Sequence, residues 1–167
     1  MNTHVIAITH RGFELKEIGN FHIAEEDRAE VLTELKNSVG LCELMYLSTC
    51  NRVEFIFTSN LELNAAFLRK FFTALPSKTV EVTLKAISSC ETYSGDAALE
   101  HLFSVASSLD SLVVGEREII TQVRNAYEPS VQLGLAGDTI RLLINKTIAT
   151  AKRIYTETAI AKNPVSV

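Results

Sequence analysis

A cysteine and an arginine two residues apart, Cys50 and Arg52, are the residues of this chain with the clearest chemical potential. Their neighbours Thr49 and Asn51 are polar, and an apolar run lies on either side, so the segment is expected to be a turn between two strands. A thiolate in such a turn is favoured by a nearby cation and by backbone amides. A guanidinium binds carboxylates and phosphates. The pair suggests covalent chemistry on an anionic acyl substrate.

Both residues also have an ordinary alternative. A single cysteine is most often a small buried hydrophobe, and an arginine in a hairpin is most often a surface residue. The polar neighbours favour a nucleophile at Cys50, and a nucleophile there makes a carboxylate clamp the more useful hypothesis for Arg52. Cys42 and Cys90 have no such neighbours, so we interpret them as structural.

His101 lies at the edge of an apolar helical stripe. Its spacing favours a half-buried histidine that packs against its neighbours, and the alternative is a proton donor or acceptor that faces the Cys50 turn. His4, His10 and His22 do not pair with cysteines or carboxylates at metal-ligand spacing, so no metal site is expected.

The composition limits the class of protein. The chain has 167 residues, of which 47% are hydrophobic, and a net charge of −4. Its pI of about 5.6 argues against a bulk-electrostatic nucleic-acid binder. The number of cysteines, three, is odd, and the sequence has no secretory signal, which predicts a cytoplasmic protein with free thiols. It also has no apolar run of about 20 residues, so no membrane span is expected. The glycines never form GxG, so no dinucleotide fingerprint is present.

Apolar periodicity predicts the elements that carry these residues. Their order, strand, helix, strand, strand, helix, strand, predicts an α+β fold, a ferredoxin-like split βαβ sandwich. They are a strand at 4–9, a helix at 25–38 ended by Gly40, strands at 43–48 and 53–58, a helix capped by Asn60 and ended by Pro76, and a strand near 86–93.

After Gly95 the pattern is helical only. We therefore divide the chain into an α+β catalytic subdomain at 1–93, a helical extension of the same domain at 94–160, and a truncated linker at 161–167. The helices of the extension are expected at 96–108, at 116–133 with a kink or break near Glu128 caused by Pro129, and from a cap at Asp138.

Three segments in this order share one resemblance. They are Ser48-Thr49-Cys50-Asn51-Arg52, the run from Ala106 to Glu116 followed by Ile119 and Gln122, and the run from Ala151 to Ile160. All three resemble the signature segments of glutamyl-tRNA reductase, and together they span nearly the whole chain. Three ordered matches are far more specific than any one of them.

The resemblance implies an activity and a role for each matching residue. The family uses NADPH to make glutamate-1-semialdehyde from glutamyl-tRNA, in tetrapyrrole (5-aminolevulinate) biosynthesis. By resemblance, Cys50 attacks the aminoacyl ester and forms a glutamyl thioester that hydride reduces, Arg52 holds the glutamate carboxylate, and His101 is the histidine important for activity. The other positions that match substrate-binding residues of the family are Thr49, Asn51, Ser111, Glu116, Arg117, Glu118 and Gln122.

The chain also departs from the family. His10-Arg11-Gly12-Phe13-Glu14 stands where the family often has His-Lys-Thr-Ala-Pro, and Arg117 stands where a proline often follows Gly-Glu. Members continue into an NADPH-binding domain and a dimerisation domain that this chain lacks, so the fragment alone is expected to lack the reductase step. For the full-length protein the resemblance implies a homodimer, and glutamate-1-semialdehyde aminomutase as the downstream enzyme.

Two other functions remain open on the residues alone. One is a non-catalytic tRNA- or protein-binding module of the same fold, which would use the cations of the last helix. The other is a thiol hydrolase or redox sensor that uses Cys50 alone. The cations of that helix are Arg141, Lys146, Lys152 and Arg153.

Overall fold

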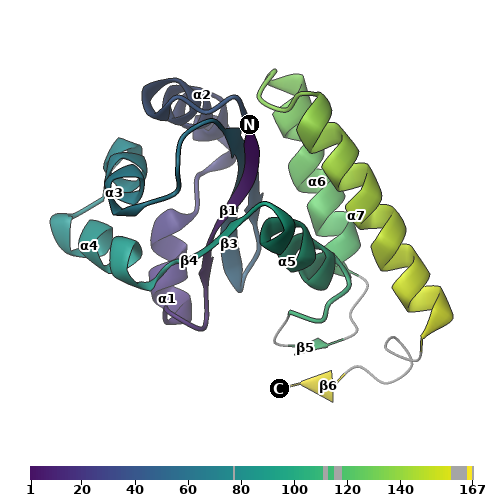
Figure 1. The fold of residues 1–167 in the computed structure, drawn as a ribbon. Coiled ribbons are helices and arrows are strands. Elements are labelled where there is room, and N and C mark those ends of the chain that lie inside the picture. The colour runs from purple at the N-terminus through teal and green to yellow at the C-terminus, as the bar shows by residue number, and fades with distance from the viewer. Residues whose placement is uncertain (77, 111–112, 115–117, 159–164, 167) are drawn as a thin grey trace.

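A four-stranded antiparallel sheet in the order β2-β3-β1-β4 forms the centre of the molecule (Figure 1). The computed structural model describes residues 1–76, 78–110, 113–114, 118–158 and 165–166. Strand β3 lies between β1 and β2, and β1 lies between β3 and β4, which is the split arrangement predicted from the sequence. The ferredoxin-like α+β fold is confirmed. The strands are β1 (Asn2–Thr9), β2 (Glu43–Ser48), β3 (Arg52–Ser59) and β4 (Glu91–Ser94).

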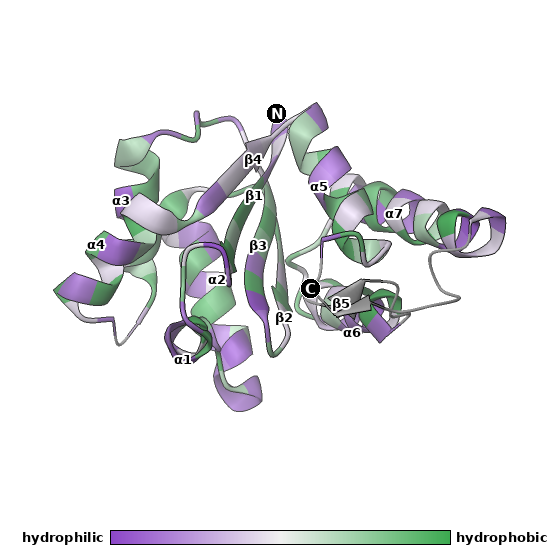
Figure 2. Cartoon of the chain, turned by 90° about the horizontal axis from the view of Figure 1, so that it is seen from below, coloured by the Kyte–Doolittle hydropathy of each residue, from purple (hydrophilic) through white to green (hydrophobic). Residues whose placement is uncertain are grey.

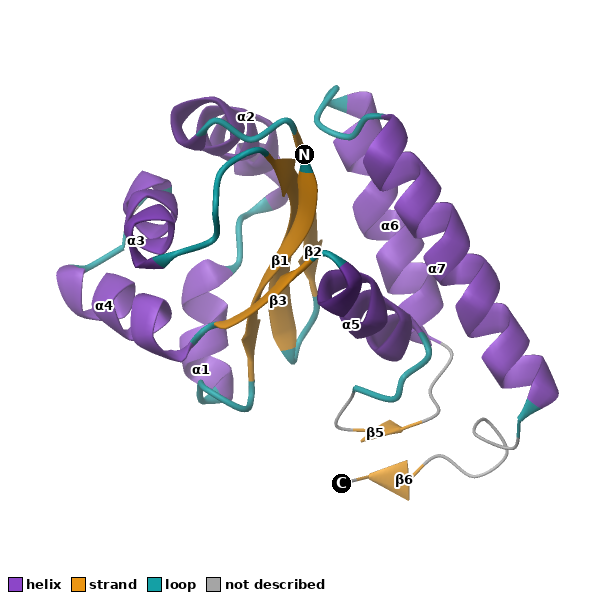
Figure 3. Ribbon diagram, viewed as in Figure 1, coloured by secondary structure: helices purple, strands orange, loops and turns teal. Residues whose placement is uncertain are grey.

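Helices cover both faces of this sheet (Figures 1 and 3). On one face lie α1 (Leu15–Ile18), α2 (Arg28–Val39), α3 (Ala65–Ala74) and α4 (Val80–Ser89). On the other lie α5 (Asp96–Ala106), α6 (Glu118–Gln132) and α7 (Asp138–Glu157), with α6 alongside the edge strand β2. Short 3₁₀ turns at Gly19–Phe21 and Glu25–Asp27 precede α2, and β5 (Val113–Val114) pairs with β6 (Val165–Ser166). No helix in the described part of the chain is long and apolar enough to cross a membrane.

The alternation along β3 connects the two layers. Val53, Phe55 and Phe57 pack into the core with α2, α3 and α4. The alternate residues Arg52, Glu54 and Ile56 face α5, α6 and α7, and two of these, Arg52 and Glu54, are charged. Figure 2 shows the apolar strands enclosed between the layers. Because β3 is buried along its whole length, its two charges need partners inside the protein.

The start of α3 differs from the prediction. The helix predicted from Asn60 begins at Ala65, because the side chain of Asn64 accepts a hydrogen bond from the Phe67 amide at 3.0 Å and caps it there.

The segment predicted as a strand near 86–93 is largely helical. Thr79 caps α4, and its hydroxyl accepts a hydrogen bond from the Val82 amide at 3.2 Å. The strand keeps only four residues, Glu91–Ser94. The valines and the threonine of α4 favour a strand locally, but the helix buries Ala86 against the core, and tertiary packing decides the outcome.

Helix α6 continues through Pro129 to Gln132, so no break occurs near Glu128, and the alternative of a kink there stays a prediction. The predicted cap of α7 is wrong. Asp138 lies inside the helix, and the first amides of α7 are held by the carboxylate of Glu43 on β2, which accepts from Thr139 at 3.2 Å and from Ile140 at 2.7 Å. Most of the expected linker at 161–167 lies outside the described residues.

Candidate functional site

Cys50 occupies the turn between β2 and β3, and its side chain is exposed. The Thr49 amide donates to the Arg52 carbonyl at 2.9 Å, and the Asn51 amide lies 3.3 Å from the Thr49 hydroxyl. These bonds hold Cys50 between two fixed neighbours. The predicted turn is confirmed, with the thiol open to solvent.

The other two thiols have different surroundings. Cys90 follows α4 and is partly buried, and this burial raises the pKa of its thiol to about 11. Cys90 is therefore protonated at neutral pH and is a poor nucleophile. Cys42 is exposed just before β2, so it is not a core residue.

Arg52 lies under α5 rather than on the surface, with 3% of its side chain exposed. Its Nη1 lies 2.8 Å from Glu54 Oε1, and its Nη2 donates to the backbone carbonyl of Asp110 and lies 3.5 Å from Asp110 Oδ1. The two segments joined by these bonds are 58 residues apart in the sequence. In this structure the guanidinium is paired inside the protein.

His101, on α5, belongs to the same set of contacts. Its Nε2 lies 3.1 Å from Glu54 Oε1 and its Nδ1 lies 3.5 Å from Asp110 Oδ2, so the imidazole bridges the two carboxylates that hold Arg52. The ring stacks on Tyr93 of β4, with 4.0 Å between centroids. The ring nitrogens of His101 point at carboxylates, and its side chain is 3% exposed. His101 thus packs against its neighbours, as the first interpretation expects, but it is buried rather than half-buried and also contacts two carboxylates.

Arg11 and Glu91 complete this group on the outer side. Arg11 lies 2.5 Å from Asp110 Oδ1 and 3.0 Å from Glu91 Oε1, and Thr9 donates to Glu91 Oε2 at 2.6 Å. Sequence analysis missed Glu54, Glu91 and Asp110 as partners. One signal was present, since Arg52 and Glu54 two residues apart share a face of a strand. We call this group the buried ion cluster, after its buried centre at Arg52, Glu54 and His101; Asp110, the half-buried Glu91 and the exposed Arg11 complete it.

The cluster shifts the titration of its carboxylates. Burial raises the pKa of Glu54, but His101 and Arg52 outweigh it, and the pKa lies below the ordinary value. Burial likewise opposes the effect of Arg52 and Arg11 at Asp110, whose pKa is also lowered. The pKa of Glu91 is lowered in the same way, against burial, by Thr9 and Arg11. All three groups are ionised at neutral pH.

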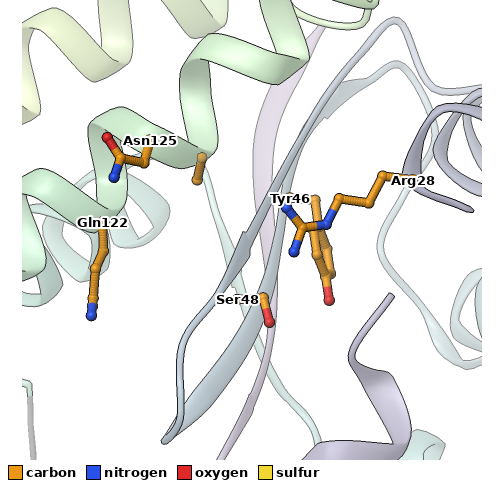
Figure 4. A pocket seen from close by; sticks show the side chains of 6 residues that line it. Arg28, Tyr46, Ser48, Gln122 and Asn125 are labelled. Atoms are coloured by element: carbon orange, nitrogen blue, oxygen red, sulfur yellow. The ribbon is translucent and has the colours of Figure 1, made fainter. Parts of the chain in front are cut away.

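Two hollows flank this region. The first, about 390 Å³, lies beside His101 and is lined by Arg11, Tyr93, Ala97, Glu100, His101, Ser104, Leu109 and Asp110. The second, about 200 Å³, lies at the end of β2, two residues before Cys50, and Figure 4 shows it from close by. We call it the Ser48 pocket, lined by Arg28, Tyr46, Ser48, Gln122, Asn125 and Ala126.

The predicted substrate-binding residues fall in several places. Thr49 and Asn51 flank Cys50 in the turn, and Gln122 lines the Ser48 pocket. Glu118 is the exposed first residue of α6. Ser111, Glu116 and Arg117 lie outside the described residues. The structure thus brings the turn and Gln122 to one end of β2, while Arg52 and His101 lie together beneath α5.

The comparisons with known proteins agree on one family. The sequence profile described as "Glutamyl-tRNAGlu reductase, N-terminal domain" matches residues 6–158. This chain belongs to that family. The match includes the Cys50 turn, the run after α5 and the whole of α7, so the resemblance inferred from the three signature segments is confirmed.

Individual relatives agree with the profile. Glutamyl-tRNA reductase of Syntrophus aciditrophicus is 36% identical over 164 residues, which cover 98% of this chain and 38% of the relative. Glutamyl-tRNA reductase 2 of Anaeromyxobacter dehalogenans is 42% identical over 135 residues, covering 81% of this chain and 28% of the relative. The solved structure of glutamyl-tRNA reductase from Methanopyrus kandleri superposes with a TM-score of 0.74 at 27% identity, covering 98% of this chain and 37% of that one. The chain thus spans less than two fifths of the length of these relatives.

Proposed function

We propose that this chain is the domain that transfers the glutamyl group of glutamyl-tRNA to the sulfur of Cys50. The observation that carries the proposal is the position of Cys50. Its thiol is exposed in a turn, and Arg52, two residues later, is anchored in the buried ion cluster. A nucleophile held in this way loses little freedom when it reacts. The family membership supplies the substrate, since its description names glutamyl-tRNA.

The chemistry is an acyl exchange from oxygen to sulfur. The thiolate of Cys50 attacks the carbonyl carbon of the ester, the bond from carbon to the terminal ribose oxygen breaks, and that oxygen takes up the proton that the thiol has lost. The products are a glutamyl thioester on Cys50 and uncharged tRNA. A thiolate is a strong nucleophile near neutral pH, and a thioester accepts hydride better than an oxygen ester.

Arg52 and His101 support this step from beneath. In the described geometry both are bound to Glu54 and Asp110, so we assign them the positioning of the turn and of the chain that leaves α5. The role of Arg52 as a carboxylate clamp, implied by the resemblance, remains a prediction. It requires Asp110 to release part of the guanidinium to the substrate.

The residues of this chain do not fit NADPH. Dinucleotides bind at the carboxyl ends of parallel strands beside a glycine-rich turn, whereas this sheet is antiparallel and the sequence has no GxG. No hydride step is therefore assigned to the chain. We expect reduction to glutamate-1-semialdehyde to require a further domain, and the chain alone to produce no aldehyde.

Intact-mass analysis after mixing the chain with charged glutamyl-tRNA tests the proposal. We expect an adduct of one glutamyl group that disappears in Cys50→Ser and persists in Cys42→Ser and Cys90→Ser. The Cys42→Ser variant is the matched control, because its thiol is also exposed. An adduct that survives Cys50→Ser, or none in the wild type, contradicts the proposal.

The alternative of a non-catalytic RNA-binding module has less support in the structure. Two of the four cations on α7 already form ion pairs on the helix surface, Arg141 with Asp138 at 2.8 Å and Arg153 with Glu157 at 3.2 Å. Binding of tRNA without any adduct in the same experiment would favour this module.

A further inference from the structure

The Ser48 pocket has the composition of an anion-binding site. Its polar lining consists of a guanidinium from α2, two hydroxyls from β2 and two side-chain amides from α6, and none of its lining residues is acidic. The chain has a net charge of −4, so a polar pocket without a carboxylate stands out from the rest of its surface and favours anions over cations. Figure 4 shows Arg28 and Tyr46 on one side of the pocket and Gln122 and Asn125 of α6 on the other, with Ser48 between them.

Arg28 is held in the pocket but keeps its terminal nitrogens available. Its Nε donates to the Ile23 carbonyl at 3.1 Å, and its guanidinium lies over the Tyr46 ring, 5.7 Å from the centroid. Nη1 and Nη2 form no hydrogen bond or ion pair with any described residue. A guanidinium fixed through Nε and through its face offers two parallel donors, the geometry that carboxylates and phosphates bind.

The opposite wall of the pocket also has unused donors. The side-chain amides of Gln122 and Asn125, one turn apart on α6, make no hydrogen bond with the residues that the structure describes. Ser48 lies between the two walls, and its hydroxyl is 3.0 Å from His22 Nδ1. Burial and the charge of Arg28 lower the pKa of His22, which is consistent with a positive potential at this site.

Arg28 and Arg52 differ in their partners. Arg52 is two residues after Cys50 and is bound to Glu54 and Asp110, whereas Arg28 lines the pocket with Ser48 and has no acidic partner among the described residues. Of these two cations, Arg28 is the one that is ready to receive an anion from outside.

We infer that the Ser48 pocket binds an anionic oxygen group, a carboxylate or a phosphate, of the substrate whose acyl group reaches Cys50. This inference rests on the proposed function and assigns a second anchoring point to it. Two parts of glutamyl-tRNA have this chemistry: the side-chain carboxylate of the glutamyl group, and the phosphodiester next to the terminal nucleotide. Arg28 supplies the charge, and Asn125 and Gln122 supply neutral donors.

The test measures the rate of acylation of Cys50 against donor concentration for two variants and two matched controls. Arg28→Gln removes the charge, and Asn125→Asp puts a carboxylate into the pocket at an exposed position with almost no change of shape. Arg124→Gln and Asn145→Asp are the controls, because they make the same changes at exposed residues outside the pocket. We expect both pocket variants to raise the half-saturating concentration about ten- to a hundred-fold, with little change in the maximal rate and no effect from the controls.

Two donors separate the two sources of the anion. With glutamyl-tRNA and with glutamate α-benzyl thioester, which has no phosphate, an equal effect of Arg28→Gln identifies the carboxylate. An effect on glutamyl-tRNA alone identifies the phosphate and is accompanied by a weaker salt dependence of binding. Wild-type behaviour of both pocket variants, or an equal effect of Arg124→Gln, overturns the inference.

A direct binding measurement keeps the inference separate from the proposed function. Inorganic phosphate and glutarate are titrated into the chain while the Arg28 Nε–H signal is followed by NMR, and the titration is repeated with Asn125→Asp. If no donor acylates Cys50, the proposed function fails, and this titration alone decides whether the pocket binds anions. A signal that either probe shifts in the wild type and not in Asn125→Asp supports the pocket, and a signal that neither probe shifts overturns it.

Discussion

The guanidinium of Arg52 and the backbone carbonyl of Asp110 join the turn that carries Cys50 to the chain that leaves α5. The two segments are 58 residues apart and lie on different layers of the fold. Arg52 is the first residue of β3 and is also bound to Glu54, so the same guanidinium contacts β3 and the chain after α5. The buried ion cluster therefore links the strand that follows Cys50 to Asp110, after the end of α5.

Removing the central carboxylate of the cluster should destabilise the fold. Glu54 is fully buried and binds both Arg52 and His101, so Glu54→Gln leaves the guanidinium without its closest counter-charge. Loss of one partner of a buried pair costs about 3–5 kcal/mol. Urea unfolding followed by circular dichroism should show this loss, while Glu30→Gln on the exposed side of α2 should stay within about 0.5 kcal/mol of wild type. A small effect at Glu54 would show that the cluster contributes little to stability.

Acid should weaken the fold through the same carboxylates. The pKa values of Glu54 and Asp110 in the folded state lie below their ordinary values of 4.5 and 3.8. The stabilisation is complete above the unfolded values and is lost as the pH falls through the folded ones. The free energy of unfolding should be flat near neutral pH and should fall once the pH drops below about 5. Asp110→Asn should flatten this fall, and an unchanged slope in the variant would contradict the assignment.

Much of the fold follows from the sequence because its signals are local. The apolar runs of β1, β2 and β3, with the helix that ends at Gly40, predict the split βαβ order. The errors occur where distant contacts decide. Asp138 looks like a cap by position, but the acceptor for the α7 amides is Glu43, which is 97 residues from Ile140.

In the candidate site too, local features could be predicted from the sequence and distant contacts could not. The Cys50 turn was predictable, because polar residues between two apolar runs mark it. The partners of Arg52 were not, because Asp110 follows α5 and reaches Arg52 only after that helix has packed on the sheet. The same holds for Arg28, whose position opposite Gln122 depends on the packing of α6 against β2.

Cys90 should react much more slowly than the other two thiols. At pH 8, a pKa of about 11 leaves about a thousandth of Cys90 as thiolate, and the side chain is also partly buried. Iodoacetamide should therefore label the exposed Cys42 and Cys50 first, as followed by peptide mass mapping. Prior modification of Cys50 should also abolish the glutamyl adduct. Fast labelling of Cys90 would show that its surroundings open in solution.

The cap of α7 gives a comparison between two acidic residues. Glu43 accepts from two amides at the start of α7, whereas the side chain of Asp138 is 92% exposed and, among the described residues, binds only Arg141. Glu43→Ala should lower the free energy of unfolding by about 1–2 kcal/mol. Asp138→Ala should cost less than about 0.5 kcal/mol, the range of an exposed ion pair. Thermal or urea unfolding distinguishes them, and equal effects would restore Asp138 as the cap.

Replacing each of two glycines between β1 and α2 by alanine should change the free energy of unfolding in opposite directions. A methyl group on Gly12 would lie 2.4 Å from the Ser89 carbonyl oxygen, a backbone atom that cannot rotate away, so Gly12→Ala should destabilise the fold by about 1–3 kcal/mol. Gly19 has open space around it and a right-handed helical conformation, so Gly19→Ala should stabilise by about 0.4–1 kcal/mol. Because Arg11 precedes Gly12, the first variant should also displace the Arg11–Asp110 pair and weaken the acid dependence described above. Urea unfolding of both variants at pH 7 and pH 4 measures the two effects. A Gly12→Ala protein as stable as wild type would mean that the turn after β1 moves freely away from α4.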